Sequence, residues 1–256
     1  MKFETTEQFP HLLKAPIVEA VIDFRAKPTG QCEQKKFETY FKEQFRGYPT
    51  LQVQFHNQVS YQLRPSSVET SEPAKAISSW HGLAFHSADK LKIAQCQRDG
   101  FSFSRLAPYE RWEVFEGEAL QLWEKYCNLT KPVEIERIGV RFINRIEIDS
   151  KGGDLSYYLV NAPRSWDSFP VPFAGFMHSD TFSVPDTNYL IHVIRALQPG
   201  DTISVKPAII LDTDIFTQTP QKVDEALVKA KLAEIRWLKN KIFFASLSPG
   251  LLESFK

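Results

Sequence analysis

The sequence predicts an α+β fold in which a curved antiparallel sheet carries helices on one face. Two observations indicate this class: some segments alternate apolar and polar residues, and others repeat apolar residues at helical spacing. A third is the element order, because strand, helix, strands and helix occur twice, over residues 16–128 and 134–239. We interpret residues 1–256 as a single domain of two tandem pseudo-repeats, with residues 240–256 as a docked C-terminal segment.

The first pseudo-repeat begins with a half-buried strand over 16–26 and a helix over 31–46. Short turns then separate runs that we expect to pair as antiparallel strands, with 66–79 as a loop: 50–65, 80–88, 90–97 and 100–106. A helix from Pro108 closes this repeat, because proline is tolerated in a first turn. Its apolar stripe is predicted to be buried: Trp112, Phe115, Ala119, Leu122, Trp123 and Tyr126.

The second pseudo-repeat begins with a strand over 134–148 and a short helix near "DLSYYLV". Strands are expected over 170–184, 188–197 and 202–213, and a helix from Pro220 to about Lys239. The buried stripe predicted for that helix is Val223, Ala226, Leu227, Ala230, Ala233 and Trp237. The apolar tail "NKIFFASLSPGLLESFK" is expected to dock, with Ser248 as the N-cap and Pro249 in the first turn of a final helix.

This element order resembles the saddle-shaped folds built from two strand-helix-strands-helix units, of which the TATA-binding protein is the best-known example. The resemblance concerns shape and implies nothing about DNA. The chain has 31 basic and 31 acidic residues, so its formal net charge is zero. Nucleic acid is therefore a disfavoured partner.

Cysteine spacing and hydropathy indicate a bacterial-type cytoplasmic protein. Cys32, Cys96 and Cys127 are odd in number and lack metal-binding spacing, so neither a disulfide framework nor a zinc site is predicted. No apolar run approaches the ~18 residues of a membrane span. No cofactor is predicted either, because a phosphate-binding glycine loop and catalytic histidine motifs are missing.

The segment "RIGVRFINRIEI" carries the main candidate site. Read with a period of two, it puts Arg137, Arg141 and Arg145 on one face of the strand and apolar residues on the other. The arginines suit a carboxylate or phosphate ligand. The alternative is a ladder of ion pairs in which Glu19 and Asp23 hold Arg141 and Arg145.

Asn144 is more diagnostic, because it interrupts the apolar face of the same strand. A buried amide costs about 1–3 kcal/mol unless it is hydrogen-bonded, so a backbone group or a ligand must satisfy it. Asp212 and Asp214 lie on one face at a predicted strand end, where capping is favoured over a metal. Three aromatic residues beside loops are candidates for a groove or a contact patch: Trp80, Tyr109 and Trp166.

Four segments, "PIVEAVIDF", "GFSFSRLAPYERWEVF", "ERIGVRFINRIEI" and "LKNKIFFASLSPGLLESF", resemble a sporadically distributed family of uncharacterised bacterial proteins. The resemblance covers most of the chain and implies no activity, cofactor or catalytic residue.

Two hypotheses about function follow from the residues. The first is a non-enzymatic protein whose sheet and loops hold an anionic ligand or a protein partner, the product of a neighbouring gene being one candidate. Arg141, Asn144, Arg145 and Trp80 are its predicted binding residues, and a homodimer is left open. The second is an enzyme for a phosphate- or carboxylate-bearing substrate, which requires Arg141, Arg145, Asp212 and Asp214 to meet in one concave pocket.

Overall fold

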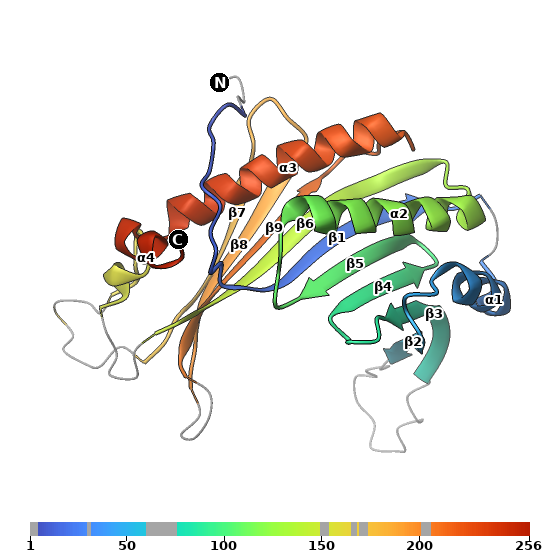
Figure 1. Cartoon of the computed structure of the whole chain (residues 1–256), viewed down its shortest axis with the longest axis horizontal. Helices are drawn as coiled ribbons and strands as arrows, with labels where there is room; N and C mark the ends of the chain where they lie inside the picture. The colour runs from blue at the N-terminus through green and yellow to red at the C-terminus, as the bar shows by residue number, and fades with distance from the viewer. Residues whose placement is uncertain are drawn as a thin grey trace, which may run out of the picture.

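Nine antiparallel strands form one open sheet in the order β2-β3-β4-β5-β1-β6-β9-β8-β7 (Figure 1). The structure is a computed structural model and describes residues 5–29, 32–59, 76–148, 154–164, 168, 174–200 and 206–256. The predicted α+β class with an antiparallel sheet is confirmed. The strands are β1 (Ile17–Lys27), β2 (Thr50–Val59), β3 (Ala76–His86), β4 (Lys92–Gln97), β5 (Gly100–Leu106), β6 (Glu134–Glu147), β7 (Met177–Ser183), β8 (Tyr189–Gln198) and β9 (Ala208–Thr217).

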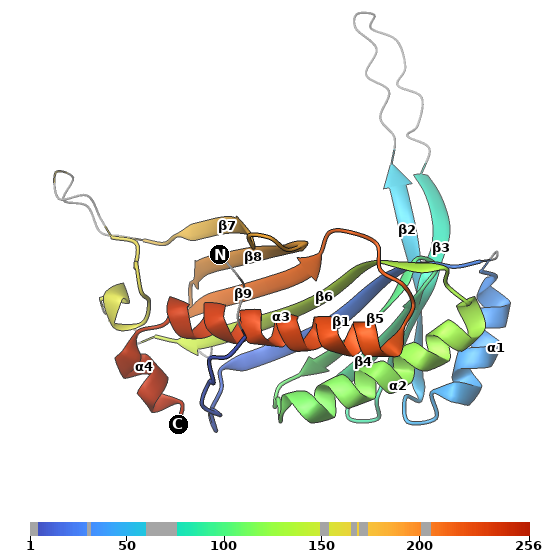
Figure 2. The ribbon, with the colours of Figure 1, turned by 90° about the horizontal axis from the view of Figure 1, so that it is seen from above.

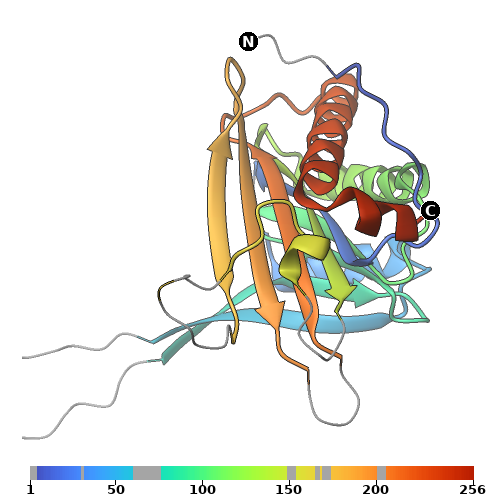
Figure 3. The ribbon, with the colours of Figure 1, turned by 90° about the vertical axis from the view of Figure 1, so that its left-hand side faces the viewer.

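The three long helices lie on the same side of the sheet (Figure 2): α1 (Gln34–Gln44), α2 (Trp112–Thr130) and α3 (Glu225–Ser246). We call this side the helix face and the other the open face; Figure 3 shows the two sides of the sheet edge-on. Every residue of the predicted α2 stripe is buried, which confirms that interpretation. A 3-10 turn (Leu155–Tyr157) follows β6, and α4 (Pro249–Ser254) follows α3.

The centre of the sheet is the pairing of β1 with β6, which brings the two halves of the chain together. Ile22 lies opposite Val140 and Phe24 opposite Ile138, and all four side chains are buried on the helix face. Side chains alternate along a strand, so the neighbouring residues point to the open face. Asp23 and Arg137 are among those residues.

Aromatic side chains fill much of the space between the helices and the sheet. The ring of Phe24 stacks on Trp123 of α2 with centroids 4.5 Å apart, and Phe41 of α1 stacks on Tyr126 at 6.3 Å. Burying a side chain of this size stabilises the fold by about 1.5–3 kcal/mol. This packing fixes α1 and α2 against the first half of the sheet.

The bounds and the buried face of α3 differ from the sequence-based prediction. The helix begins at Glu225, not Pro220, because Gln221 forms a two-way backbone bridge with Ile135 that holds this part of the chain extended. It also continues past Lys239 to Ser246. The predicted stripe is wrong, since alanines were counted as core residues, and the buried residues are the larger Val228, Leu232, Ile235 and Leu238.

Other boundaries shift as well. β9 begins at Ala208, after Pro207, and runs to Thr217, so Asp212 and Asp214 lie in mid-strand and not at a strand end. Residues 76–79, predicted as loop, belong to β3. The rest of that predicted loop, 66–75, and Trp166 lie outside the described residues.

The two ends of the chain pack together beside α3. Ser248 caps α4 by accepting a hydrogen bond from the backbone N–H of Leu251, and Leu251 is buried. Residues 7–15, which we call the N-terminal strap, cross α3 on their way to β1 (Figure 1). The carbonyl of Glu7 accepts from Trp237 Nε1 at 3.0 Å, and the N–H of Lys14 donates to the carbonyl of Phe255 at 2.9 Å.

Candidate functional site

The arginines of β6 are held by carboxylates on the open face. Arg137 pairs with Asp23 of β1 and donates from Nη2 to both oxygens of Asp214 of β9, each at 2.8 Å. Arg141 holds Asp212 with two bonds, Nε to Oδ1 at 2.8 Å and Nη2 to Oδ2 at 2.5 Å. The predicted partners were wrong: Arg141 pairs with Asp212 of β9, Arg145 pairs with Glu147 of its own strand, and Asp23 holds Arg137 instead.

These ion pairs also determine the structural role of the Asp212 and Asp214 carboxylates. Burial raises the pKa of Asp214, and the nearby Arg137 opposes that rise. Within the described residues no group of three His, Cys, Asp or Glu side chains is placed to hold a metal ion. The two aspartates therefore act as partners of arginines in the structure.

Arg145 and Trp80, the other predicted binding residues of the exposed surface, lie apart from this network. Arg145 donates to the carbonyl of Lys206 at 2.6 Å and pairs with Glu147 at 3.2 Å. Trp80 donates from Nε1 to the carbonyl of Gly82 and packs edge-on against Phe37. Arg141, Arg145, Asp212 and Asp214 thus do not meet in the pocket that the enzyme hypothesis requires.

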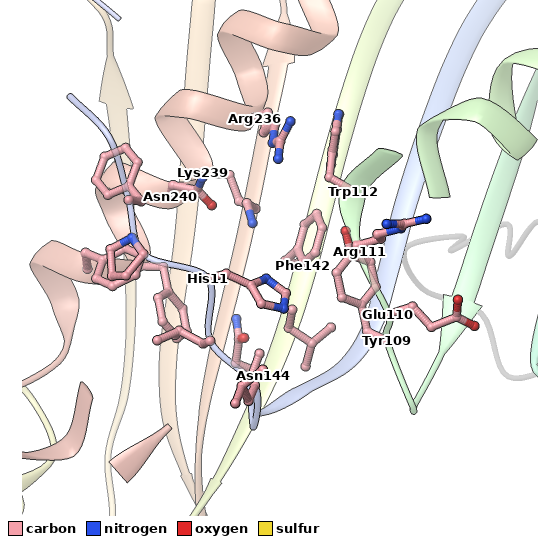
Figure 4. Close-up of a pocket in the computed structure, with 18 of the residues that line it drawn as sticks. His11, Tyr109, Glu110, Arg111, Trp112, Phe142, Asn144, Arg236, Lys239 and Asn240 are labelled. Atoms are coloured by element: carbon pink, nitrogen blue, oxygen red, sulfur yellow. The ribbon is translucent and has the colours of Figure 1, made fainter. Parts of the chain in front are cut away.

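A cavity of about 390 Å³ lies on the helix face instead (Figure 4). Its floor is Phe142 and Asn144 of β6 with Thr213 of β9. The C-terminal half of α3 forms one wall, residues 107–113 form another, and the N-terminal strap forms a third. This size falls within the range of small-molecule sites, ~300–1,000 Å³.

Asn144 contributes an unsatisfied polar atom to the floor of this cavity. The residue is only 2% exposed. Its Nδ2 donates to the carbonyl of Leu211 at 3.2 Å, whereas its Oδ1 accepts no hydrogen bond from the described residues. The bond to Leu211 fixes which end of the amide is oxygen. Asn144 Oδ1 is therefore a buried acceptor without a partner among the described residues, in a side chain that lines the cavity.

Lys239 extends from α3 into the same cavity (Figure 4). Its Nζ lies 4.2 Å from the centre of the Phe142 ring, and it forms no ion pair or hydrogen bond with any described residue. Burial, together with the charge of the neighbouring Arg236, lowers the pKa of Lys239 to about 7. Near neutral pH the cavity thus holds both the amine and the ammonium form.

The two acids that line the cavity do not neutralise Lys239, because arginines hold them. Arg236 pairs with Glu113 at 2.8 Å and lies over the ring of Trp112. Glu110 pairs with Arg105 at 3.4 Å. The cavity consequently retains an uncompensated positive site.

Aromatic rings make up much of the remaining lining. Phe9 of the strap stacks on Phe244 of α3 with centroids 5.3 Å apart, and Tyr109 packs edge-on against Phe142 at 5.4 Å. Burial raises the pKa of Tyr109, so its phenol stays protonated and can donate a hydrogen bond. The lining suits a ligand that has a flat apolar part.

Sequence reasoning singled out Asn144 and Tyr109 but missed Lys239 and the strap. A signal for Lys239 was present: Leu232, Ile235, Lys239 and Ile242 follow helical spacing, so the lysine stands in the inward-facing stripe of α3. The role of the strap has no local signal, because residues 7–15 are held beside the cavity by contacts with the distant C-terminal helices.

Comparison with known families finds no matching family model, and none of the curated proteins is significantly similar. Among the described residues, none of the helices combines the length and apolarity needed to cross a membrane.

Proposed function

We propose that the chain is a binding protein for a small aromatic carboxylate, held in the cavity on the helix face. The observation that carries the proposal is the pair of unsatisfied polar groups there, Asn144 Oδ1 and Lys239 Nζ. The buried acceptor of Asn144 is unfavourable without a donor, and the half-buried ammonium of Lys239 is unfavourable without an anion. A ligand that supplies the missing partners offsets both costs.

The chemistry of the ligand follows from these partners. A carboxylate next to Lys239 favours the ammonium form of the lysine and forms a charge-assisted hydrogen bond with it. A hydroxyl or amide N–H donates to Asn144 Oδ1. An aromatic ring packs between Phe9, Tyr109 and Phe244, which line opposite parts of the cavity. The proposal moves the anion site from the open face, where the arginines are already paired, to the helix face.

A matched set of ligands tests this function by thermal shift. Phenyllactate carries ring, carboxylate and hydroxyl, phenylpropionate lacks the hydroxyl, and phenylethanol lacks the carboxylate. We expect phenyllactate to raise the melting temperature most, since a ligand that binds only the native state stabilises it by mass action. Each of the two ligands that lack one group should raise the melting temperature less. Equal shifts for all three, or none, contradict the proposal.

Two variants locate the site. Lys239→Met should remove the preference for carboxylates while leaving the fold intact, whereas Lys229→Met, which changes an exposed lysine of the same helix, should bind like the wild type. Carboxylate binding should also weaken as pH rises through about 7, because Lys239 loses its charge there.

We also propose that the two halves are pseudo-repeats related across the β1–β6 pair, giving a saddle similar in shape to the TATA-binding protein. Support comes from topology: the strands that follow β1 lie on its far side in the order β5, β4, β3, β2, and those that follow β6 lie as β9, β8, β7. Each half also ends in a long helix, α2 or α3. In the described part of the second half, a 3-10 turn stands where the first half has α1.

A further inference from the structure

We infer that Lys239 is a nucleophile that captures the carbonyl group of an aromatic α-oxo acid as an imine. This inference rests on the proposed function, because it uses the same cavity and narrows the ligand class. It adds a covalent step to what is otherwise reversible anion binding.

The geometry provides the three groups that imine formation needs. Lys239 Nζ lies over Phe142 inside the cavity, away from any carboxylate that would keep it protonated. Asn144 follows Phe142 by two residues on the same face of β6, roughly 6.7 Å along the strand. Its Oδ1 accepts no hydrogen bond from the described residues. Tyr109 lines the opposite wall with a protonated phenol (Figure 4).

The charges around Lys239 favour the reactive amine. The titratable groups that line the cavity beside Lys239 are one on α3, one on the strap and four on the 107–113 wall: Arg236, His11, and Tyr109, Glu110, Arg111 and Glu113. Glu113 and Glu110 are paired with arginines, so they leave Lys239 without an anionic partner. Burial brings the pKa of Lys239 to about 7, which makes a large fraction of neutral amine available at neutral pH.

The reaction is a balanced condensation without an oxidant or reductant. The lone pair of Nζ forms a bond to the carbonyl carbon, and the carbonyl π electrons move to the oxygen, which takes a proton from the Tyr109 phenol. Nζ returns a proton to the phenolate, which leaves a carbinolamine whose hydroxyl can donate to Asn144 Oδ1. Loss of that hydroxyl with one proton releases water, and a carbon–nitrogen double bond forms to Lys239.

Reductive trapping of the full chain tests the inference. The protein is incubated with phenylpyruvate and sodium cyanoborohydride at about pH 8, and the modified lysines are identified by peptide mass spectrometry. We expect Lys239 to be labelled on the order of tenfold faster than the exposed Lys229 and Lys241, because an amine with a pKa near 7 is far less protonated at this pH than an ordinary lysine. Phenyllactate, which has no carbonyl, should slow the labelling by competition.

The Lys239→Arg variant removes the amine that would be captured, because an arginine cannot form the imine. We expect it to lose the label, whereas Lys229→Met, which changes an exposed lysine, should keep both the label at Lys239 and the stabilisation by phenyllactate. Label spread evenly over exposed lysines overturns the inference, and if phenyllactate still stabilises the wild type, the proposed binding function stands alone. Absence of both label and stabilisation overturns the two together. If Lys239→Arg fails to fold, two measurements on the wild type test the inference in its place: the distribution of label over the lysines, and the slowing of that labelling by phenyllactate.

Discussion

Lys239 and Asn144 each place a polar group on an apolar surface, one on the inward stripe of α3 and one on the helix face of β6. Neither is placed by local preference: a lysine and an asparagine are usually exposed at such positions in helices and strands. The structure keeps both side chains because they face a cavity and not a packed core. We expect these two side chains to lower the free energy of unfolding, and we expect Lys239 to make that free energy depend on pH.

Lys239→Met should stabilise the chain at neutral pH. The native pKa of about 7 lies below the unfolded value of 10.5, so the unfolded chain binds more protons between these values and wild-type stability rises with pH across that window. Removing the lysine should add on the order of a few kcal/mol at pH 7 and progressively less toward pH 10.5. Urea denaturation at several pH values measures this, with Lys229→Met as the control; an unchanged pH slope contradicts it.

Gly139 makes room for the ion pair between Asp23 and Arg137. A Cβ at this position would lie 2.3 Å from Asp23 Oδ1 and 2.8 Å from Arg137 Cζ. We expect Gly139→Ala to destabilise the chain by about 1–3 kcal/mol, because the methyl group displaces a partly buried ion pair. Gly117→Ala is the control, since a Cβ there meets nothing within 4 Å and alanine favours the α2 helix. Equal melting temperatures for the two variants would refute the argument.

At the scale of elements, local sequence patterns predicted most of the helices and strands. They failed where contacts with distant segments determine the bounds of an element. The alternation of residues 134–148 identified β6, and helical spacing identified the buried stripe of α2. The start of α3 was missed because Gln221 bridges to Ile135, a residue far away in sequence. Alanine fits either face of a helix, so counting alanines as core residues assigned the α3 stripe to the wrong face, although the larger apolar residues carried the correct spacing.

The C-terminal segment should contribute measurably to stability. Deleting residues 248–256 removes the buried Leu251 and the carbonyl of Phe255 that accepts from Lys14. We expect a loss of about 2–5 kcal/mol and a lower melting temperature, because an apolar surface under α4 becomes exposed. Deleting Lys256 alone is the control, since that side chain pairs only with exposed Glu253. Equal melting temperatures for both truncations would show that α4 adds nothing.

At the scale of the whole molecule, the two halves share one sheet and one hydrophobic core. The sequence could not predict which acids meet the arginines of β6, because the pairing of β6 with β9 depends on how the whole second half returns to the centre of the sheet. The same holds for the cavity. Its floor, two walls and strap come from five separate parts of the chain: the strap, residues 107–113, β6, β9 and α3.

Each half alone should fail to fold. Separating residues 1–131 from 132–256 exposes the long β1 and β6 edges and the apolar surfaces beside them. We expect the separate halves to be insoluble, and the full chain to unfold in urea as one transition when followed by tryptophan fluorescence and by circular dichroism. A soluble half with native-like circular dichroism, or two resolved transitions in the full chain, would contradict this expectation.

The position of β1 also has a consequence for synthesis on the ribosome. β1 precedes both of its neighbours in the chain: β5 follows only after α1, β2, β3 and β4, and β6 lies beyond α2. Until β6 emerges, the backbone N–H and C=O groups along at least one edge of β1 have no partner in the sheet, and such an edge can accept a strand from another chain. Exposure to misassembly between neighbouring nascent chains is thus greatest before β5 is made, when both edges are free, and ends only after α2 has been translated.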